Sequence, residues 1–484
     1  MVNAKTTANA AWLVGCRVAG DIVAFALFVA ISRHFGPAGI GTYSYGFAVA
    51  TLGYYVSALG IDDYGVREYV RLPRSEGVRL IAELLGAQWV VIAATVAALA
   101  LYLWAAGELR GEVATIVALL SSYQFAFALT RTLFIPAMGQ QEMIAPAVVE
   151  LACRGFAVVL AFMLIMLWHA TLAESLVGFA IGAVILIVAS AWSARRRVGA
   201  VRVSSSWRGT LERIRLLWSF AAAAALVQVF ARVGLVVLTL AAGAAVTGIY
   251  ATGLKFVEVA LVPLFFSGFA LYPALSRLSV SDPRGFLHAS MRFLFAWELM
   301  SGLTAWALYF AIPPLLEPLL GGRFAATAPV LRLMIPLAMV QAAEQALMRL
   351  LLVSDLQLPR LRLVALATLL NLLLTVALVP RWGISGAVVS GTLACGALVA
   401  GYVLVLPAAV RRLVTRSTLV LTASLALAAG AAWYAQYTGL AYWLTAIAAG
   451  GCFLASLAVL HGMSHRAFPL PGTTLVGVRA RTRN

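Results

Sequence analysis

The chain has 484 residues, of which 63% are hydrophobic and only 11% are charged. A soluble domain averages about 45–50% apolar and about 25% charged residues, so this composition excludes a soluble globular protein and indicates a polytopic membrane protein. The formal net charge is +17. Most basic residues lie in short intervals between apolar runs, where they orient membrane spans and meet anionic lipid, so nucleic acid is not expected as a partner.

Long apolar runs predict fourteen transmembrane helices, because one crossing needs about 20 mostly apolar residues. Inside lipid every backbone polar group needs a partner within the protein, and these runs lack the alternation of a β-barrel, so each crossing is expected to be helical. The expected fold class is therefore an all-α polytopic membrane protein. In chain order, the expected spans are residues 11–33, 42–62, 80–106, 113–136, 145–168, 171–193, 214–241, 247–273, 288–314, 327–353, 359–379, 384–409, 417–437 and 440–461.

Basic residues are concentrated in alternate intervals between these spans. The interval after the sixth span is the most basic, and the intervals on the opposite side hold little beyond Arg110, Arg323 and Arg381. Cytoplasmic loops of membrane proteins carry an excess of Arg and Lys. We therefore predict an even number of spans, with the N- and C-termini both in the cytoplasm.

The polar intervals are too short to hold a soluble catalytic domain. We find no hydrolase, kinase or dinucleotide-binding motif in the sequence. Its many glycines lie in apolar helical contexts and not after a predicted strand, as a dinucleotide-binding motif requires. The four cysteines, Cys16, Cys153, Cys395 and Cys452, have the spacing of neither a metal site nor a disulfide framework. We expect a protein that is not an enzyme, with no catalytic residue, no metal ligand and no cofactor.

A short motif repeats in the two halves of the chain. The segments GTYSYG (41–46) and GIYATG (248–253) both read G-x-Y-x-x-G and open the second and eighth spans. Six spans of equal orientation on either side of the basic interval predict two pseudo-symmetric six-helix lobes plus two C-terminal helices. The expected boundaries are an N-terminal lobe at 1–194, a basic cytoplasmic linker at 195–213, a C-terminal lobe at 214–410, spans thirteen and fourteen at 411–463 and a cytoplasmic tail at 464–484.

Several motifs follow one another in a characteristic order between about Trp12 and Leu406. They are Phe35-Gly36-Pro37, Leu59-Gly60-Ile61, Val246 to Tyr250, Leu271-Tyr272-Pro273, Leu320-Gly321-Gly322, and Val379-Pro380 with Gly383 and Gly386. In this order and spacing the chain resembles the polysaccharide, or oligosaccharidyl-lipid, flippases of the multidrug/oligosaccharidyl-lipid/polysaccharide exporter superfamily. One position departs from that pattern, since Val233 stands where the family usually has an acidic residue.

This resemblance implies fourteen helices, two six-helix lobes and an alternating-access mechanism. It also implies that the substrate is an undecaprenyl-diphosphate-linked glycan, moved from the cytoplasmic to the outer leaflet of the bacterial inner membrane for polysaccharide biosynthesis such as that of O-antigen or exopolysaccharide. The implied partners are this lipid-linked oligosaccharide, membrane lipids, and the polysaccharide polymerase and export machinery. Coupling to a proton gradient, a sodium gradient or the membrane potential is expected.

Ionisable residues inside the expected spans are the candidate transport residues. Each costs about 2.5–3.5 kcal/mol to insert at a helix centre, so it normally faces protein or water. Arginine suits a diphosphate because its planar guanidinium binds phosphate oxygens in a bidentate manner. The cationic candidates for binding the substrate are Arg17, Arg131, Arg154, Arg232 and Lys255, and the acidic candidates for coupling or counter-ion roles are Asp21, Glu150, Glu258 and Glu344.

Sequence spacing supplies a structural alternative for these residues. Three opposite-charge pairs are three or four residues apart, so each pair can meet on one helix face and do no more than hold helices together. They are Arg17 with Asp21, Glu150 with Arg154, and Lys255 with Glu258. Two further arginines, Arg332 and Arg349, are expected near span ends, with their guanidinium groups extended to the interface. The five histidines are expected at span ends or in the tail and are not assigned as proton relays.

The alternative function is a cation-coupled multidrug or small-molecule antiporter on the same fold. Such a protein needs an acidic, aromatic cavity for cationic drugs. The candidate transport residues of the first lobe are three arginines, Arg17, Arg131 and Arg154, and only two carboxylates, Asp21 and Glu150. This excess of arginine favours an anionic substrate.

Overall fold

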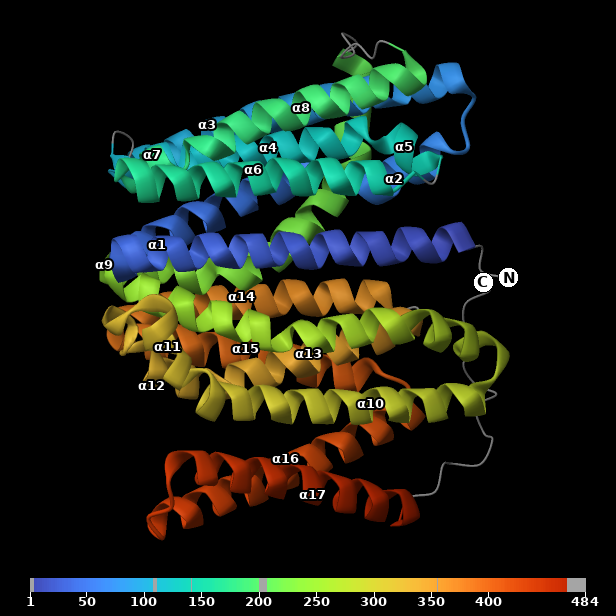
Figure 1. Cartoon of the computed structure of the whole chain (residues 1–484). Helices are drawn as coiled ribbons and strands as arrows, with labels where there is room; N and C mark the ends of the chain where they lie inside the picture. The colour runs from blue at the N-terminus through green and yellow to red at the C-terminus, as the bar shows by residue number, and fades with distance from the viewer. Residues whose placement is uncertain (1–3, 108–110, 141, 200–206, 355, 468–484) are drawn as a thin grey trace. The chain divides into compact units, whose positions relative to one another are not determined.

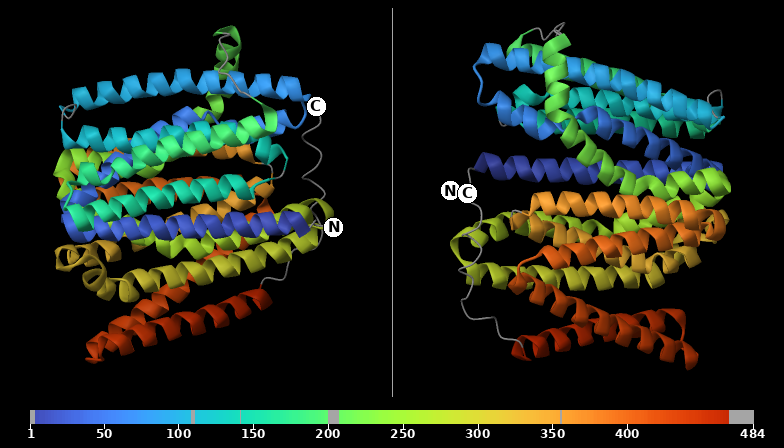
Figure 2. Two further views of the ribbon diagram at one scale, coloured as in Figure 1. Left: turned by 45° about the horizontal axis from the view of Figure 1, so that its top comes forward. Right: turned by 180° about the vertical axis from the view of Figure 1, so that it is seen from behind.

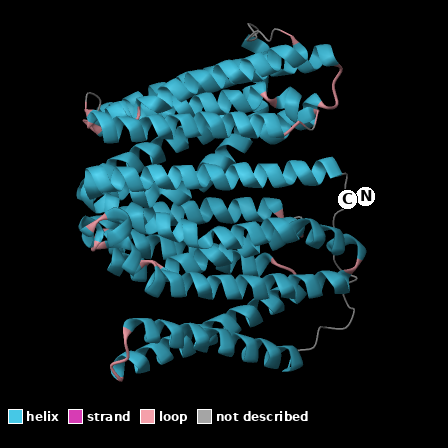
Figure 3. Cartoon of the chain, viewed as in Figure 1, coloured by secondary structure: helices cyan, strands magenta, loops and turns pink. Residues whose placement is uncertain are grey.

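The computed structural model describes residues 4–107, 111–140, 142–199, 207–354 and 356–467. These residues form helices joined by short loops, without a strand in any of the described ranges (Figure 3). The expected all-α fold class is confirmed. The described residues do not include part of the predicted linker or most of the predicted tail. They also do not include five arginines that contribute to the charge of the polar intervals: Arg110, Arg202, Arg479, Arg481 and Arg483.

The described contacts divide the chain into unit 1, residues 1–248, and unit 2, residues 249–484. The predicted lobe boundary at 195–213 rests on the sequence repeat and stays a prediction. The helices that begin in unit 1 are α1 (Ala4–Ala58), α2 (Ile61–Tyr69), α3 (Arg74–Ala105), α4 (Glu112–Leu133), α5 (Ile135–Gly139), α6 (Ile144–Trp168), α7 (Leu172–Ser175), α8 (Val177–Val198) and α9 (Trp207–Ser281).

Helix α9 continues into unit 2, where shorter elements separate the long helices. These are α10 (Pro283–Trp306), a π-helical turn (Ala307–Ala311), α11 (Pro313–Leu320), a 3₁₀ turn (Gly322–Phe324), α12 (Thr327–Leu333), α13 (Ile335–Val353), α14 (Gln357–Trp382), α15 (Ile384–Val405), α16 (Ala408–Tyr437) and α17 (Tyr442–Ala467).

Twelve helical segments of the described chain are long and apolar enough to cross a membrane. Two of them, Gly15–Ala58 and Trp207–Phe265, have 44 and 59 residues. A straight helix of 44 residues is about 66 Å long, roughly twice the thickness of the hydrocarbon core, so each of these segments supplies two crossings. Counted in this way, the structure has the fourteen crossings that the apolar runs predict.

Each double-length helix is broken at a single glycine. Helix α1 is interrupted at Gly36 (φ 67°, ψ −163°) and α9 at Gly243 (φ 82°, ψ 174°). A positive φ is accessible to glycine without steric cost, because glycine has no Cβ atom. The intervals predicted between spans at 34–41 and 242–246 are therefore reduced to a break at one glycine, and the chain is helical on both sides of that break.

Unit 1 is a bundle around α4. In this bundle α4 packs against α1, α3 and α8, and α6 packs against α1 and α8; the long axes of α3, α4, α6 and α8 run side by side (Figures 1 and 2). Buried polar side chains hold the helices together, since Gln88 of α3 accepts from Thr132 at 2.7 Å and donates to the Ala128 carbonyl at 3.1 Å. Buried hydrogen bonds of this kind fix the rotation of helices that are apolar on every face.

In unit 2, α14 and α15 form a hairpin that turns at Gly383, where φ is 54°, and α13 packs on α15. The terminal pair α16–α17 packs against α10. The expected ninth and tenth spans are corrected by the structure. The ninth continues through a π-helical turn, and the tenth is split at Met334 into α12 and α13, where Pro336 lies in the first turn of α13. The proline ring restricts the preceding residues and lacks an amide donor, so the helix cannot run through.

Candidate functional site

Five of the predicted transport residues gather in unit 1, where α1, α4 and α6 meet. Arg17 and Asp21 come from α1, Arg131 from α4, and Glu150 and Arg154 from α6. Arg17 Nε lies 3.2 Å from Asp21 Oδ2, as the i,i+4 spacing predicts. We refer to these five residues as the unit 1 charge cluster.

Two contacts in the unit 1 charge cluster join different helices. Arg154 Nη1 lies 3.9 Å from Asp21 Oδ1, and Arg131 Nη1 donates to Glu150 Oε1 at 3.4 Å. Asp21 thus lies between two arginines, Arg17 and Arg154. The i,i+4 spacing predicted that Glu150 and Arg154 pair with each other. It could not predict these partners, Arg131 for Glu150 and Asp21 for Arg154, because they lie on other helices.

Exposure differs sharply within the unit 1 charge cluster. The side chain of Arg17 is 67% exposed and that of Asp21 48%, whereas Glu150 is only 20% exposed. The guanidinium of Arg17 is therefore open to an incoming anion. The Arg131–Glu150 pair is more enclosed, which favours a role in holding α4 to α6.

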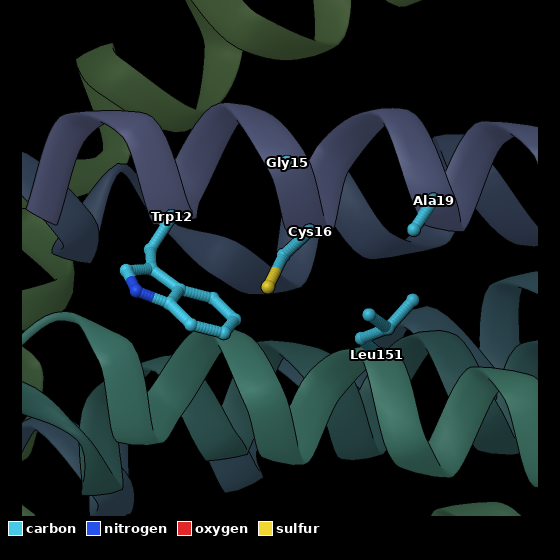
Figure 4. A pocket seen from close by; sticks show the side chains of 5 residues that line it. All are labelled: Trp12, Gly15, Cys16, Ala19 and Leu151. Carbon is cyan, nitrogen blue, oxygen red and sulfur yellow. The ribbon is translucent and has the colours of Figure 1, made fainter. Parts of the chain in front are cut away.

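A cavity of about 360 Å³ adjoins the unit 1 charge cluster between α1 and α6 (Figure 4). Its lining is apolar and comes from Trp12, Gly15, Cys16, Ala19 and Leu151. A Cβ atom at Gly20 of α1 would lie 3.3 Å from Arg154 Nη1 and 3.8 Å from Leu151 Cδ1, so one wall of the cavity lies beside the charge cluster. A charged group next to an apolar hollow is the arrangement that an amphiphilic molecule requires.

The remaining predicted residues lie elsewhere. Arg232 is half-buried in the unit 1 part of α9. In unit 2, Lys255 Nζ lies 3.3 Å from Glu258 Oε2, so the predicted i,i+3 pair is present. Glu344 of α13 lies beside Arg360 of α14 and Tyr402 of α15. Whether each of these residues binds substrate, couples an ion or only pairs stays a prediction.

Arg349 was expected near a span end, with its guanidinium extended to the interface. The structure corrects this expectation. Its residue exposure is 6%, and Nη2 donates to the Phe265 carbonyl at 3.1 Å. Gly268 makes room for it, since a Cβ atom at that position would lie 1.9 Å from Arg349 Nε. The guanidinium has a hydrogen-bond acceptor inside unit 2, so Arg349 does not need to extend to the aqueous interface.

The first arginines of the predicted linker belong to the last turn of α8. Arg197 donates from Nε and Nη2 to Glu142 Oε2 at 3.1 and 2.5 Å, and the Arg196 guanidinium lies 3.6 Å from the centre of the Trp192 ring. Cations in a last turn also complement the helix dipole. This part of the predicted linker is therefore the C-terminal end of α8, and Arg197 joins it to Glu142, just before α6.

The structure contains two clusters of ionisable groups that were not predicted from the sequence. In the first, Glu83 of α3 accepts from Arg213 of α9 at 3.0 Å and from Arg79 at 3.0 Å, and Arg213 also donates to the Tyr64 hydroxyl at 2.9 Å. The side chain of Glu83 is only 8% exposed. A carboxylate within an apolar run was the available signal in the sequence, but its partner Arg213 lies far away along the chain.

The second cluster lies in unit 2. Glu298 of α10 has no exposed surface, and His461 Nδ1 of α17 lies 3.4 Å from its Oε2 atom. Arg416 and Ser417 of α16 lie beside the same carboxylate. His461 was expected at a span end, without a role; its contact with Glu298 depends on how α17 packs.

Residues 6–279 match the family model described as polysaccharide biosynthesis protein. This match covers more than half of the chain. The chain belongs to the polysaccharide biosynthesis protein family. The resemblance inferred from the motifs is confirmed, and a search of the curated proteins found no match.

Solved structures show which fold this polysaccharide biosynthesis protein has. It is similar to the lipid II flippase MurJ in an inward closed conformation, with a TM-score of 0.70 at 12% identity over 94% of this chain and 99% of that chain. It is also similar to an inward-facing multidrug resistance MATE family transporter of the MOP superfamily, with a TM-score of 0.60 at 12% identity over 82% of this chain and 95% of that chain. A Vibrio cholerae MATE transporter, VcmN in the bent form, has a TM-score of 0.50 at 17% identity over 86% of this chain and 99% of that chain.

Identities this low show the fold alone. The polysaccharide biosynthesis protein therefore has the fold shared by these flippases and transporters, and it is a multi-pass membrane protein. The solved structures with this fold are a flippase and transporters.

Proposed function

We propose that this protein is a flippase that moves a polyprenyl-diphosphate-linked oligosaccharide across the bacterial inner membrane by alternating access. The observation that carries the proposal is the unit 1 charge cluster beside an apolar cavity. Arg17 and Arg154 share one carboxylate, Asp21, so the pair of guanidinium groups keeps a net positive charge. The family membership and the fold similar to a lipid II flippase support the same conclusion.

The proposed chemistry is recognition of a diphosphate. A diphosphate presents several oxygens, and two guanidinium groups on different helices can each take one phosphate in a bidentate manner. Since no bond is made or broken, the protein needs only to exchange Asp21 for the diphosphate as the partner of Arg17 and Arg154. The apolar cavity lined by Trp12 and Leu151 offers a place for the first apolar part of the lipid.

Alternating access then moves the head group while most of the lipid tail stays in the bilayer. The helix pair α16–α17 provides an apolar surface along which the tail travels. Arg131, Arg232 and Lys255 are further cationic residues that contribute to binding the substrate, and Asp21, Glu150, Glu258 and Glu344 serve as counter-ions or coupling groups. The driving force would be a proton gradient, a sodium gradient or the membrane potential.

The cellular setting is part of the proposal. The termini lie in the cytoplasm, the lipid carrier is undecaprenyl diphosphate, and the glycan belongs to a surface polysaccharide such as O-antigen or exopolysaccharide. A polysaccharide polymerase and the export machinery then take up the glycan at the outer leaflet. These assignments are supported by the pattern of basic loops and by the family.

The test is transport by purified protein in liposomes that contain a labelled polyprenyl-diphosphate oligosaccharide. We expect the wild type to move the label between leaflets and Arg17→Glu to abolish this movement while the variant remains folded in a thermal-unfolding assay. Arg412→Glu is the matched control, because Arg412 is an exposed arginine outside the cluster, and it should transport normally.

Two results would overturn the proposal. One is that wild-type protein leaves the labelled lipid in its original leaflet while a reference flippase moves it. The other is uptake of a cationic dye in exchange for protons in the same liposomes, which would favour the multidrug antiporter instead. Loss of folding in Arg17→Glu would assign the cluster to packing and would remove the observation on which the proposal rests.

A further inference from the structure

Glu298 is a carboxylate that the proposed flippase mechanism does not use. It lies in α10 with no exposed surface, where α10 meets α16 and α17. An ionised carboxylate in such a place is costly unless a cation accompanies it, so intramembrane carboxylates usually have a function. The structure places an arginine and a histidine beside this single carboxylate.

The two partners differ in chemistry and in the helix that carries them. His461 of α17 lies 3.4 Å from the Glu298 carboxylate, and Arg416 of α16 lies beside it. Arginine keeps its charge at every physiological pH, whereas histidine gains and loses its charge between about pH 5 and pH 8. One carboxylate is thus shared by a permanent cation and a titratable one.

Other charged groups on the helices around α10 are engaged elsewhere. In α13, Glu344 lies beside Arg360, and Arg349 donates to the Phe265 carbonyl. In α9, which accepts a hydrogen bond from Thr304 of α10, Lys255 pairs with Glu258. In α10 itself, Arg292 is exposed. Among the side chains that the structure describes, those that lie beside Glu298 are therefore His461, Arg416 and Ser417.

The other end of α17 is held by contacts that do not titrate. Trp306 Nε1 donates to the Ala446 carbonyl at 2.9 Å, and the Tyr442 hydroxyl donates to the Phe310 carbonyl at 2.8 Å. His461 lies 19 residues beyond Tyr442, which is about 28 Å along a helix. One end of α17 is thus fixed to the α10 region by neutral hydrogen bonds, and the other end by a histidine–carboxylate pair.

We propose that Glu298 and His461 form a proton-binding site that governs how the far end of α17 docks on α10. With the proton bound, His461 is a cation and pairs with Glu298. When the proton leaves, Glu298 keeps only Arg416 of α16, and α17 swings outward about its fixed Tyr442 end. The site is independent of what the protein transports.

The experiment measures distances between spin labels by electron paramagnetic resonance in the full-length protein, reconstituted in lipid nanodiscs without substrate. The labels are attached to cysteines that replace Leu366 of α14 and Gly462 of α17, after the four native cysteines are replaced by alanine. Leu366 is exposed, and Gly462 has open space around its Cβ position. A control pair uses Leu366 with Leu444, which is exposed near the fixed end of α17.

We expect the 366–462 distance to increase by several ångströms as the pH rises from about 5 to about 8, while the 366–444 distance stays constant. Glu298→Gln and His461→Gln should each abolish the change. The second variant alters the more exposed partner, so it serves as the test if Glu298→Gln does not fold. A pH-independent 366–462 distance in the wild type overturns the proposal, as does a change that persists in His461→Gln or that is equal for both label pairs.

Discussion

Gly41 and Gly248 pack against each other at a reciprocal crossing of α1 and α9. A Cβ atom at Gly41 would lie 1.8 Å from the Ala244 carbonyl oxygen, and one at Gly248 would lie 1.8 Å from the Pro37 carbonyl oxygen. Each glycine comes five residues after the glycine that breaks its helix and contacts the residue just after the break in the other helix. The repeated G-x-Y-x-x-G motif therefore marks equivalent positions in a symmetric contact.

We predict that Gly41→Ala and Gly248→Ala each destabilise the protein. The added methyl group meets backbone oxygen, which has no rotamer to yield, so the cost should reach or exceed the about 1–3 kcal/mol typical of overpacking. Thermal unfolding of the detergent-purified protein measures the effect. Gly155→Ala on α6 is the control, since that position has open space around it. Equal stability of all three variants would contradict the close crossing.

Asp21 should lower the affinity of the proposed site for a diphosphate. Since it pairs with Arg17 and approaches Arg154, Asp21→Asn should strengthen the binding of inorganic pyrophosphate. Exposed ion pairs are worth up to about 1 kcal/mol, so the gain should be roughly fivefold in affinity.

Arg154→Gln should weaken the same binding, and Arg412→Gln should leave it unchanged. Stabilisation against heat as pyrophosphate is added measures all three, because a ligand that binds only the folded protein raises its unfolding temperature. Weaker binding in Asp21→Asn would show that the carboxylate organises the arginines instead of competing for them.

Glu83 should stabilise the start of α9 against α3. Its carboxylate is almost buried and accepts from two arginines, so Glu83→Gln should cost about 1.5–3 kcal/mol. Arg79 is 78% exposed, and Arg79→Gln should cost less than about 1 kcal/mol. Unfolding by heat separates the two variants. A larger loss in Arg79→Gln than in Glu83→Gln would exclude Arg213 as the principal partner.

Gly302 and Phe453 should be energetically coupled. A Cβ atom at Gly302 would lie 1.8 Å from Phe453 Cζ, so Gly302→Ala should destabilise the docking of α17 by about 1–3 kcal/mol. The shorter side chain in Phe453→Leu makes room for that methyl group. In a double-mutant cycle on thermal stability we expect the double variant to recover at least about 0.5 kcal/mol relative to the sum of the single variants. Additive effects would contradict the contact.

Much of the fold could be predicted from composition and local spacing. The apolar runs identified fourteen crossings because hydrophobic thickness sets the length of a span. The Arg17–Asp21 and Lys255–Glu258 pairs could be predicted because residues three or four apart share a helix face. The kinks at Gly36 and Gly243 were harder, since a one-residue break in a helix resembles a loop when only hydropathy is considered.

The all-α membrane class, the number of crossings, the repeat and the family's motifs could all be recognised in the amino-acid sequence. Four contacts became visible only in the folded protein: Arg154 approaches Asp21, Arg131 pairs with Glu150, Arg213 pairs with Glu83, and His461 faces Glu298. Hydropathy and helical spacing give information about one segment of the chain at a time. Contacts between helices depend on the rotation and depth at which each helix packs, and those are set by buried polar groups and closely packed glycines that lie far apart in the sequence.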